Sequence, residues 1–244
     1  MPRRTFLTSV LVGAAFLGCG ESAGPRLDGP SPTQQPRYLT WAGGAPLVIR
    51  AAGTSVATRG TDTGTRGGDL PEGFSASLQL SEYQVGFWAV KGQARGVQVD
   101  YQACVERDLE QCTVWAWRPY LLFDVPANAL AQRPDGSAIP TGDSVFIALA
   151  IDPLNLVVDL EPSGLQFDAV DRAVLQMYYT GAQGDYDGDG DSDAVDSDIE
   201  QQWLGMFFQT TPTEPWVTMG SQHSLSGRWF TAWLEHFSGY AIAW

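Results

Sequence analysis

Val145-Phe-Ile-Ala-Leu-Ala-Ile151 is a short, uninterrupted apolar run, and it predicts a β-strand that is buried on both faces. Upstream, Val97-Gln-Val-Asp-Tyr101 alternates apolar and polar residues, which is typical of a half-buried strand. Turn formers such as Pro134-Asp-Gly136 and Pro162-Ser-Gly164 separate runs of this kind. Many short strands with turn signals and almost no helical periodicity predict an all-β fold, an antiparallel β-sandwich.

The predicted sandwich occupies residues 74–244. Pro119 lies inside one apolar run and predicts either two short strands or one bent edge strand there, because proline cannot donate to a strand ladder. The remaining strands are expected at residues 83–90, 113–124, 156–160, 173–179, 203–209, 216–219, 228–234 and 240–244.

An acidic segment, Gly184-Asp-Tyr-Asp-Gly-Asp-Gly-Asp-Ser-Asp-Ala-Val-Asp-Ser-Asp-Ile-Glu200, interrupts this β pattern and contains no Lys or Arg. Carboxylates packed this densely repel one another, so the segment is either solvated or wrapped around a cation. The whole chain has a net charge of −14, with 28 Asp and Glu against 14 Lys and Arg. That charge argues against nucleic acid as a partner, since phosphates would be repelled.

The spacing of the acids matches a twelve-residue calcium loop, with Gly190 at the sharp turn of position 6. It resembles the loops of dockerin modules, which also close with Asp at position 12, although Ser192 departs from the usual apolar residue at position 8. A dockerin carries two such loops and only one is present, so cohesin binding is not expected. The alternative is a solvated acidic loop without metal. The candidate calcium ligands are Asp185, Asp187, Asp189, Asp191 through its carbonyl oxygen, Asp193 and Asp196.

The N-terminus predicts an export signal at residues 1–18, with Arg3 and Arg4 before a short apolar segment. Phe16-Leu17-Gly18-Cys19 resembles a bacterial lipobox, which implies cleavage before Cys19, lipidation of its thiol and anchoring in the cell envelope. Arg3-Arg4-Thr5-Phe6-Leu7 also resembles a twin-arginine signal. A plain secretory signal with a chance cysteine is the alternative.

Residues 19–73 are rich in Gly, Pro, Ser and Thr, and their composition predicts a flexible tether between the lipid and the sandwich. Residues 38–52 are more apolar and are expected to form a strand or a docked segment. With Cys19 acylated, Cys104 and Cys112 remain as a pair that flanks a polar loop between two β-like runs. We therefore expect a disulfide across a hairpin.

Three segments in the C-terminal half resemble the ZU-five domain, the β-sandwich module of ankyrins and netrin receptors. They are Val125-Pro-Ala-Asn-Ala-Leu130, Leu160-Glu-Pro-Ser-Gly-Leu-Gln-Phe-Asp168 and Leu234-Glu-His-Phe-Ser-Gly-Tyr-Ala-Ile242. The resemblance covers residues 120–244. Two features depart from the family pattern, Asn128 where Gly is usual and the acidic segment, which the animal domains lack.

In certain ZU-five proteins the segment similar to His236-Phe237-Ser238 is a self-cleavage site. The resemblance implies that the Ser238 hydroxyl attacks the Phe237 carbonyl, with His236 as base or proton donor. The alternative is structural, with Phe237 in the core and Ser238 shaping a bend. No other catalytic motif is present, and His223 is the only other histidine.

The sequence thus predicts a lipid-anchored envelope protein with a calcium-bound sandwich that acts as a non-enzymatic interaction module toward a protein or glycan partner. The alternative is a carbohydrate-binding or carbohydrate-active envelope protein. Under that hypothesis exposed tryptophans stack on sugars, the candidates being Trp115, Trp117, Trp203, Trp216 and Trp229.

Overall fold

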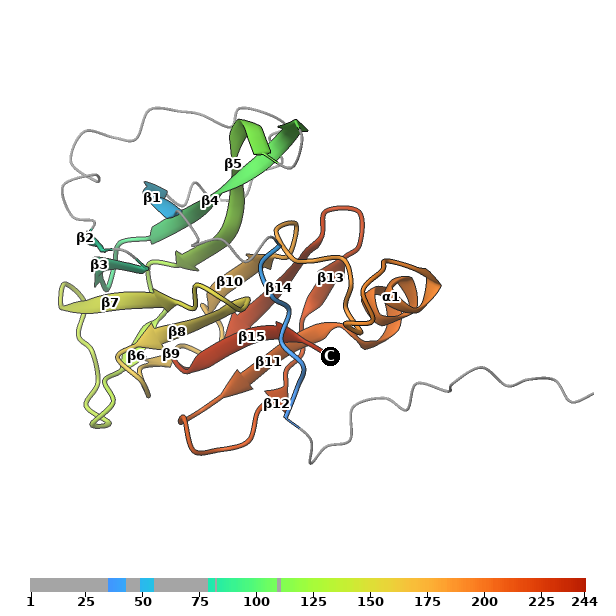
Figure 1. Cartoon of the computed structure of the whole chain (residues 1–244). Helices are drawn as coiled ribbons and strands as arrows, with labels where there is room; N and C mark the ends of the chain where they lie inside the picture. Colours follow the sequence, from blue (N-terminus) through green and yellow to red (C-terminus); the bar gives the residue numbers. More distant parts are fainter. Residues whose placement is uncertain (1–34, 43–48, 55–78, 82, 109–110) are drawn as a thin grey trace, which may run out of the picture.

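The computed structural model describes residues 35–42, 49–54, 79–81, 83–108 and 111–244 (Figure 1). The predicted signal peptide, Cys19 and much of the predicted tether lie outside these residues. The strands in chain order are β1 (Ile49–Thr54), β2 (Gln79–Ser81), β3 (Gln84–Val90), β4 (Arg95–Asp108), β5 (Gln111–Val125), β6 (Leu130–Gln132), β7 (Ser144–Ile151), β8 (Val157–Glu161), β9 (Gln166–Phe167), β10 (Ala173–Tyr178), β11 (Gly205–Gln209), β12 (Val217–Thr218), β13 (Gln222–Ser224), β14 (Trp229–Leu234) and β15 (Gly239–Ala243).

Two large antiparallel sheets pack face to face. One has the strand order β1-β4-β5-β10-β14-β13, and the other has the order β12-β11-β15-β8-β7-β3-β2. Side chains alternate along β3, where Phe87 points into the core and Trp88 is exposed. Phe123 from the first sheet packs between Phe87 and Phe237, with ring centroids 6.4 and 5.7 Å away. The prediction of an antiparallel β-sandwich is confirmed.

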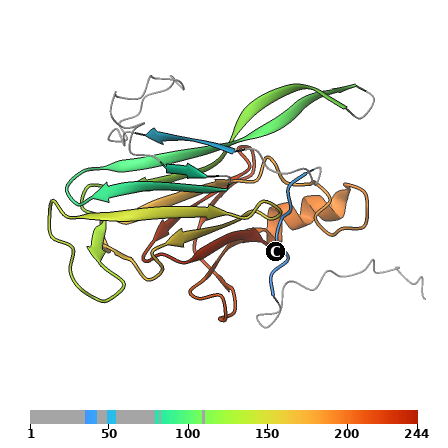
Figure 2. The ribbon, with the colours of Figure 1, turned by 60° about the vertical axis from the view of Figure 1, so that its left-hand side comes forward.

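Beyond the sandwich, β4 and β5 continue as a two-stranded arm, which projects from the layers in Figure 2. β5 is one long strand that lies inside the sheet rather than at its edge, because β10 pairs with it at residues 121–124. Pro119 is tolerated because it lies outside that pairing, next to an irregular step between Val99 and Asp100 of β4. The predicted disulfide joins Cys104 and Cys112 across the arm, with a Cα–Cα distance of 5.7 Å.

The sandwich begins before residue 74. Leu39 is buried, and its amide donates to the Ile242 carbonyl at 3.1 Å while its carbonyl accepts from the Leu156 amide at 2.8 Å. Trp41 is also buried, against Tyr101 and Tyr120. Since β1 pairs with β4 as well, part of the stretch that its composition assigns to the tether belongs to the folded domain.

A short helix α1 (Ala194–Asp198) lies in the C-terminal part of the acidic segment and runs directly into a π-helical turn, η2 (Ile199–Trp203). The strand expected at residues 203–209 starts only after this turn, as β11. Ile199 anchors the helical segment, since its side chain is fully buried. In the part of the chain that the structure describes, no helix has the length and apolarity needed to cross a membrane.

Candidate metal centre

The first part of the acidic segment forms a compact loop that follows β10 and runs into the first turn of α1; we call it the acid loop (residues 184–196; Figure 1). Both ends of the described chain hold it in place. The Arg37 guanidinium donates to the Asp187 carbonyl at 2.9 Å, and the Trp244 indole N–H donates to the Tyr186 carbonyl at 3.2 Å. The acid loop is therefore tied to the sandwich through its backbone.

The carboxylate of Asp185 organises the first half of the acid loop. It accepts hydrogen bonds from three backbone amides, those of Gly188 at 2.7 Å, Asp189 at 3.1 Å and Gly190 at 3.0 Å. Gly190 has a φ of +104°, a backbone conformation that glycine adopts without strain. The residue predicted at position 6 thus makes the sharp turn that the calcium-loop pattern requires.

The carboxylate of Asp196 closes the second half. One oxygen accepts from the Tyr186 amide and, at 3.3 Å, from the Asp187 amide. The other accepts from the Asp193 amide at 3.0 Å, while the Asp193 side chain caps the start of α1 by accepting from the Val195 amide at 2.6 Å. This reciprocal arrangement is a capping box. Asp196 is buried, so these backbone amides, rather than water, donate hydrogen bonds to its carboxylate.

The structure brings the six predicted ligands together as two neighbouring groups rather than as one ring. Asp185, Asp187 and Asp189 form one group, and Asp191, Asp193 and Asp196 form the other. Within each group, one carboxylate oxygen per residue lies within 4.8 Å of the others. Asp191 was predicted to act through its carbonyl, and here its carboxylate joins the second group. Hard carboxylate oxygens at this separation fit a hard divalent cation.

Crowding of like charges affects the protonation of two of these acids. The negative charge of Asp189 and desolvation raise the pKa of Asp191 above its usual range. Desolvation, together with the charges of Asp189, Asp196 and Asp185, raises the pKa of Asp187. The acid loop thus carries electrostatic repulsion that a bound cation would relieve.

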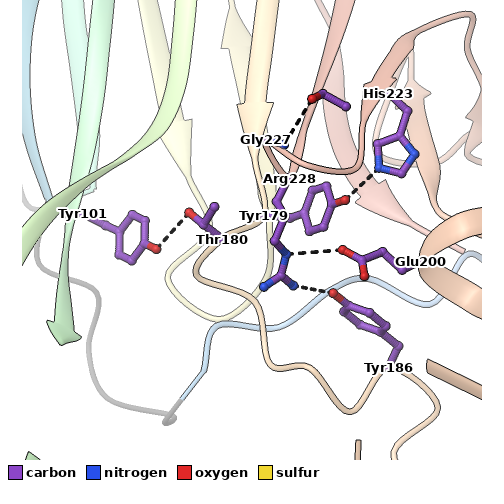
Figure 3. Close-up of polar contacts among 9 residues, drawn as sticks. Tyr101, Tyr179, Thr180, Tyr186, Glu200, His223, Gly227 and Arg228 are labelled. Atoms are coloured by element: carbon purple, nitrogen blue, oxygen red, sulfur yellow. Dashed lines mark hydrogen bonds and ion pairs between the residues drawn. The ribbon is translucent and has the colours of Figure 1, made fainter. Parts of the chain in front are cut away.

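A cluster around Arg228 connects the acid loop to the sheets, and the sequence interpretation missed it (Figure 3). The Arg228 guanidinium donates to the Tyr186 hydroxyl at 2.6 Å and forms an ion pair with Glu200 at 3.3 Å. Its Cζ also lies 5.1 Å from the centroid of the Tyr179 ring. The sequence contains a signal for this role, because Arg228 is the only Lys or Arg after Arg172.

His223 belongs to the same cluster and has a packing role. Its Nε2 lies 2.7 Å from the Tyr179 hydroxyl oxygen, and its ring stacks on Phe230 with a centroid distance of 4.0 Å. Burial lowers the pKa of His223.

The predicted cleavage segment lies between β14 and β15. Phe237 is fully buried, and its carbonyl accepts from the Gly164 amide at 3.2 Å and lies 3.4 Å from Nδ1 of His236. The hydroxyl of Ser238 is buried and has no hydrogen-bond partner among the described residues. The His236 carbonyl is bonded by the Tyr240 hydroxyl, and burial raises the pKa of that hydroxyl to about 12.

The candidate sugar-stacking tryptophans are spread over several elements of the fold. Trp115 and Trp117 are exposed on the arm, and Arg50 covers Trp117 at 4.4 Å from its ring centroid. Three others are half-buried: Trp203 at the end of η2, Trp216 just before β12 and Trp229 at the start of β14. Trp216 packs against Tyr38, with ring centroids 5.5 Å apart.

The chain matches no protein-family model, no curated protein and no solved structure. The resemblance to ZU-five and dockerin modules therefore rests on the residues quoted above.

Proposed function

We propose that this chain is a bacterial cell-envelope lipoprotein whose β-sandwich binds calcium through the acid loop and acts as a non-enzymatic interaction module. The observation that carries the calcium part is the way Asp185 and Asp196 fold the loop. Their carboxylates accept hydrogen bonds from backbone amides of the loop and so close it into a turn. In this turn the carboxylates of the other acids lie close to one another. Calcium takes six to eight oxygen ligands in flexible geometry and suits such a set.

Bound calcium would supply the positive charge that offsets repulsion among the carboxylates. Its role would be structural, because the acid loop is joined to both ends of the described chain and, through Tyr186, to Arg228. A cation that favours the folded loop would therefore stabilise the whole sandwich by mass action.

The envelope location rests on residues 1–19, and the non-enzymatic role rests on the setting of the two histidines. The His223 ring contacts the Tyr179 hydroxyl and stacks on Phe230. The His236 ring packs edge-on against Phe208 at a centroid distance of 5.7 Å. Self-cleavage after Phe237 is the one reaction that remains a candidate.

Thermal unfolding in calcium tests the proposal. At a calcium concentration of 100 times Kd, binding to the folded state alone contributes about 2.7 kcal/mol, which corresponds to about 5–10 °C in Tm. Asp187→Ala combined with Asp189→Ala should abolish the shift. Magnesium at the same concentration should give a smaller shift, because it demands a stricter octahedral geometry.

A matched control is Glu106→Ala combined with Asp108→Ala, which removes two exposed acids from the arm and should keep the full shift. If the wild-type protein unfolds at the same temperature in calcium and in chelator, the acid loop is a solvated loop and the calcium proposal is wrong.

A further inference from the structure

A groove opens where the arm leaves the sandwich, beside the ends of β10 and β14. Its volume is about 530 Å³, within the range of small-molecule sites. It shares no lining residue with the hollow that borders the acid loop. The described residues that line it include Tyr101, Cys104, Arg118, Pro119, Thr180 and Trp229.

The groove follows from the strand pairing. β10 accompanies β5 only over residues 121–124, whereas it accompanies β14 along its full length to the pair of Tyr178 with Trp229. Pro119 has no amide to donate, and the arm bends away at this point. The disulfide between Cys104 and Cys112 ties the two arm strands together beside the groove. The groove is thus built from the irregular part of β4 and β5, the ends of β10 and β14 and one covalent link.

The walls combine aromatic rings with hydroxyl groups. Tyr101 points toward Thr180, and their hydroxyl oxygens lie 3.2 Å apart (Figure 3). Trp229 is half-buried and lines the groove from β14. Apolar ring faces with a few polar groups are the usual composition of a small-molecule site.

The charge of the groove is opposite to that of the protein. None of the acidic residues that the structure describes lines this groove, and Arg118 supplies a positive charge. The ion pairs among the described residues do not include Arg118, in contrast to Arg228, which is paired with Glu200. Burial raises the pKa of Tyr101, and the hydrogen bond with Thr180, followed by the charges of Arg118 and Arg228, opposes that rise.

We propose that this groove binds a carboxylated monosaccharide, a uronic acid, with the carboxylate on Arg118 and the sugar ring against the half-buried Trp229. Guanidinium groups bind carboxylates through two parallel hydrogen bonds, which gives Arg118 a specific partner. Longer polyanions are disfavoured by the net charge of −14. The inference goes beyond the proposed function and does not depend on calcium in the acid loop.

Calorimetric titration of the full chain with glucuronate and with glucose tests this assignment, because the two sugars differ at the carboxylate. Glucuronate should bind at least tenfold more tightly than glucose. Arg118→Gln should remove that difference without changing Tm. Arg107→Gln removes a charge from the same arm outside the groove and should keep the difference.

A second measurement locates the sugar. The indole N–H signal of Trp229, assigned by its loss in Trp229→Phe, should shift with glucuronate in the wild-type protein and not in Arg118→Gln. Equal affinities for the two sugars, no binding of either, or equal losses in the two arginine variants would each overturn the proposal. Titration in chelator should give the same result, so a failure of the calcium proposal is seen separately, as an absent Tm shift.

Discussion

The buried carboxylate of Asp196 accepts a hydrogen bond from the backbone amide of Tyr186, ten residues earlier in the chain. The same side chain accepts from the amides of Asp187 and Asp193. One residue therefore closes the acid loop and caps the helix that follows it. Its burial distinguishes Asp196 from the other acids of the loop, which are half-buried or exposed.

Asp196→Ala should destabilise the protein in chelator, where no metal contributes. Three amides would lose a charged acceptor, and we expect a loss of about 2–3 kcal/mol in the free energy of unfolding. Asp189→Ala removes the same charge from an exposed position and should cost less than about 1 kcal/mol. Urea unfolding of the two variants measures both values, and equal losses would contradict the special role of Asp196.

His223 should make stability depend on pH in the mildly acidic range. Burial lowers its pKa in the folded state below the unfolded value of about 6.5, while the charge of Glu200 opposes this to a smaller extent. Folding therefore favours the neutral ring. That contribution is complete above the unfolded pKa and is lost as pH falls through the folded pKa.

The comparison of wild type with His223→Gln isolates this effect, because the variant has no imidazole to protonate. Between pH about 7.5 and about 5, the Tm of the wild-type protein should fall further than that of the variant. The variant loses the ring stack on Phe230 at every pH, which lowers its Tm by a constant amount. Parallel curves would show that His223 titrates normally.

Most of the strands that the sequence predicts are those whose own side chains build the core. The apolar run at residues 145–151 corresponds to β7, which starts one residue earlier. By contrast, β13 is a short strand of polar residues that the sequence does not predict, and its partner β14 determines it. Local composition cannot reveal such a strand, because its stability comes from pairing with another strand.

In the acid loop, too, the sequence predicts only what neighbouring residues determine. Spacing alone identifies the acids, since the loop ligands follow one another in the chain. The contact between Arg228 and Tyr186 joins residues 42 positions apart, and only the fold brings them together. The division of the acids into two groups also depends on side-chain directions that spacing does not determine.

Lipidation is tested at the cysteine of the predicted lipobox. Cys19→Ala should leave the protein without an acyl anchor, so that it appears in the soluble fraction after cell breakage, whereas wild type stays with membranes. Cys104→Ala with Cys112→Ala is the matched control, because it removes cysteines that form the disulfide and should leave membrane association intact. Membrane retention of Cys19→Ala would show that the lipobox interpretation is wrong.

The cleavage hypothesis and the structural hypothesis for Ser238 predict different chemistry. In the first, the hydroxyl oxygen attacks the Phe237 carbonyl carbon, the peptide C–N bond breaks to give an ester, and water then opens that ester. In the second, the hydroxyl is a buried group without a partner among the described residues. Ser238→Ala would then be neutral or stabilising by about 1 kcal/mol, since it removes an unsatisfied polar atom.

Intact mass under denaturing conditions decides between these hypotheses. β15 pairs with β8 on one side and with β11 on the other, so a cleaved segment 238–244 would stay in the sheet and a native gel would miss it. If cleavage occurs, wild type should separate into two masses after prolonged incubation, and Ser238→Ala should remain a single chain. His236→Gln should slow the reaction if the imidazole moves a proton. A wild-type chain of full mass that still includes residues 238–244 rules out cleavage, and a stability gain in Ser238→Ala then supports the structural role.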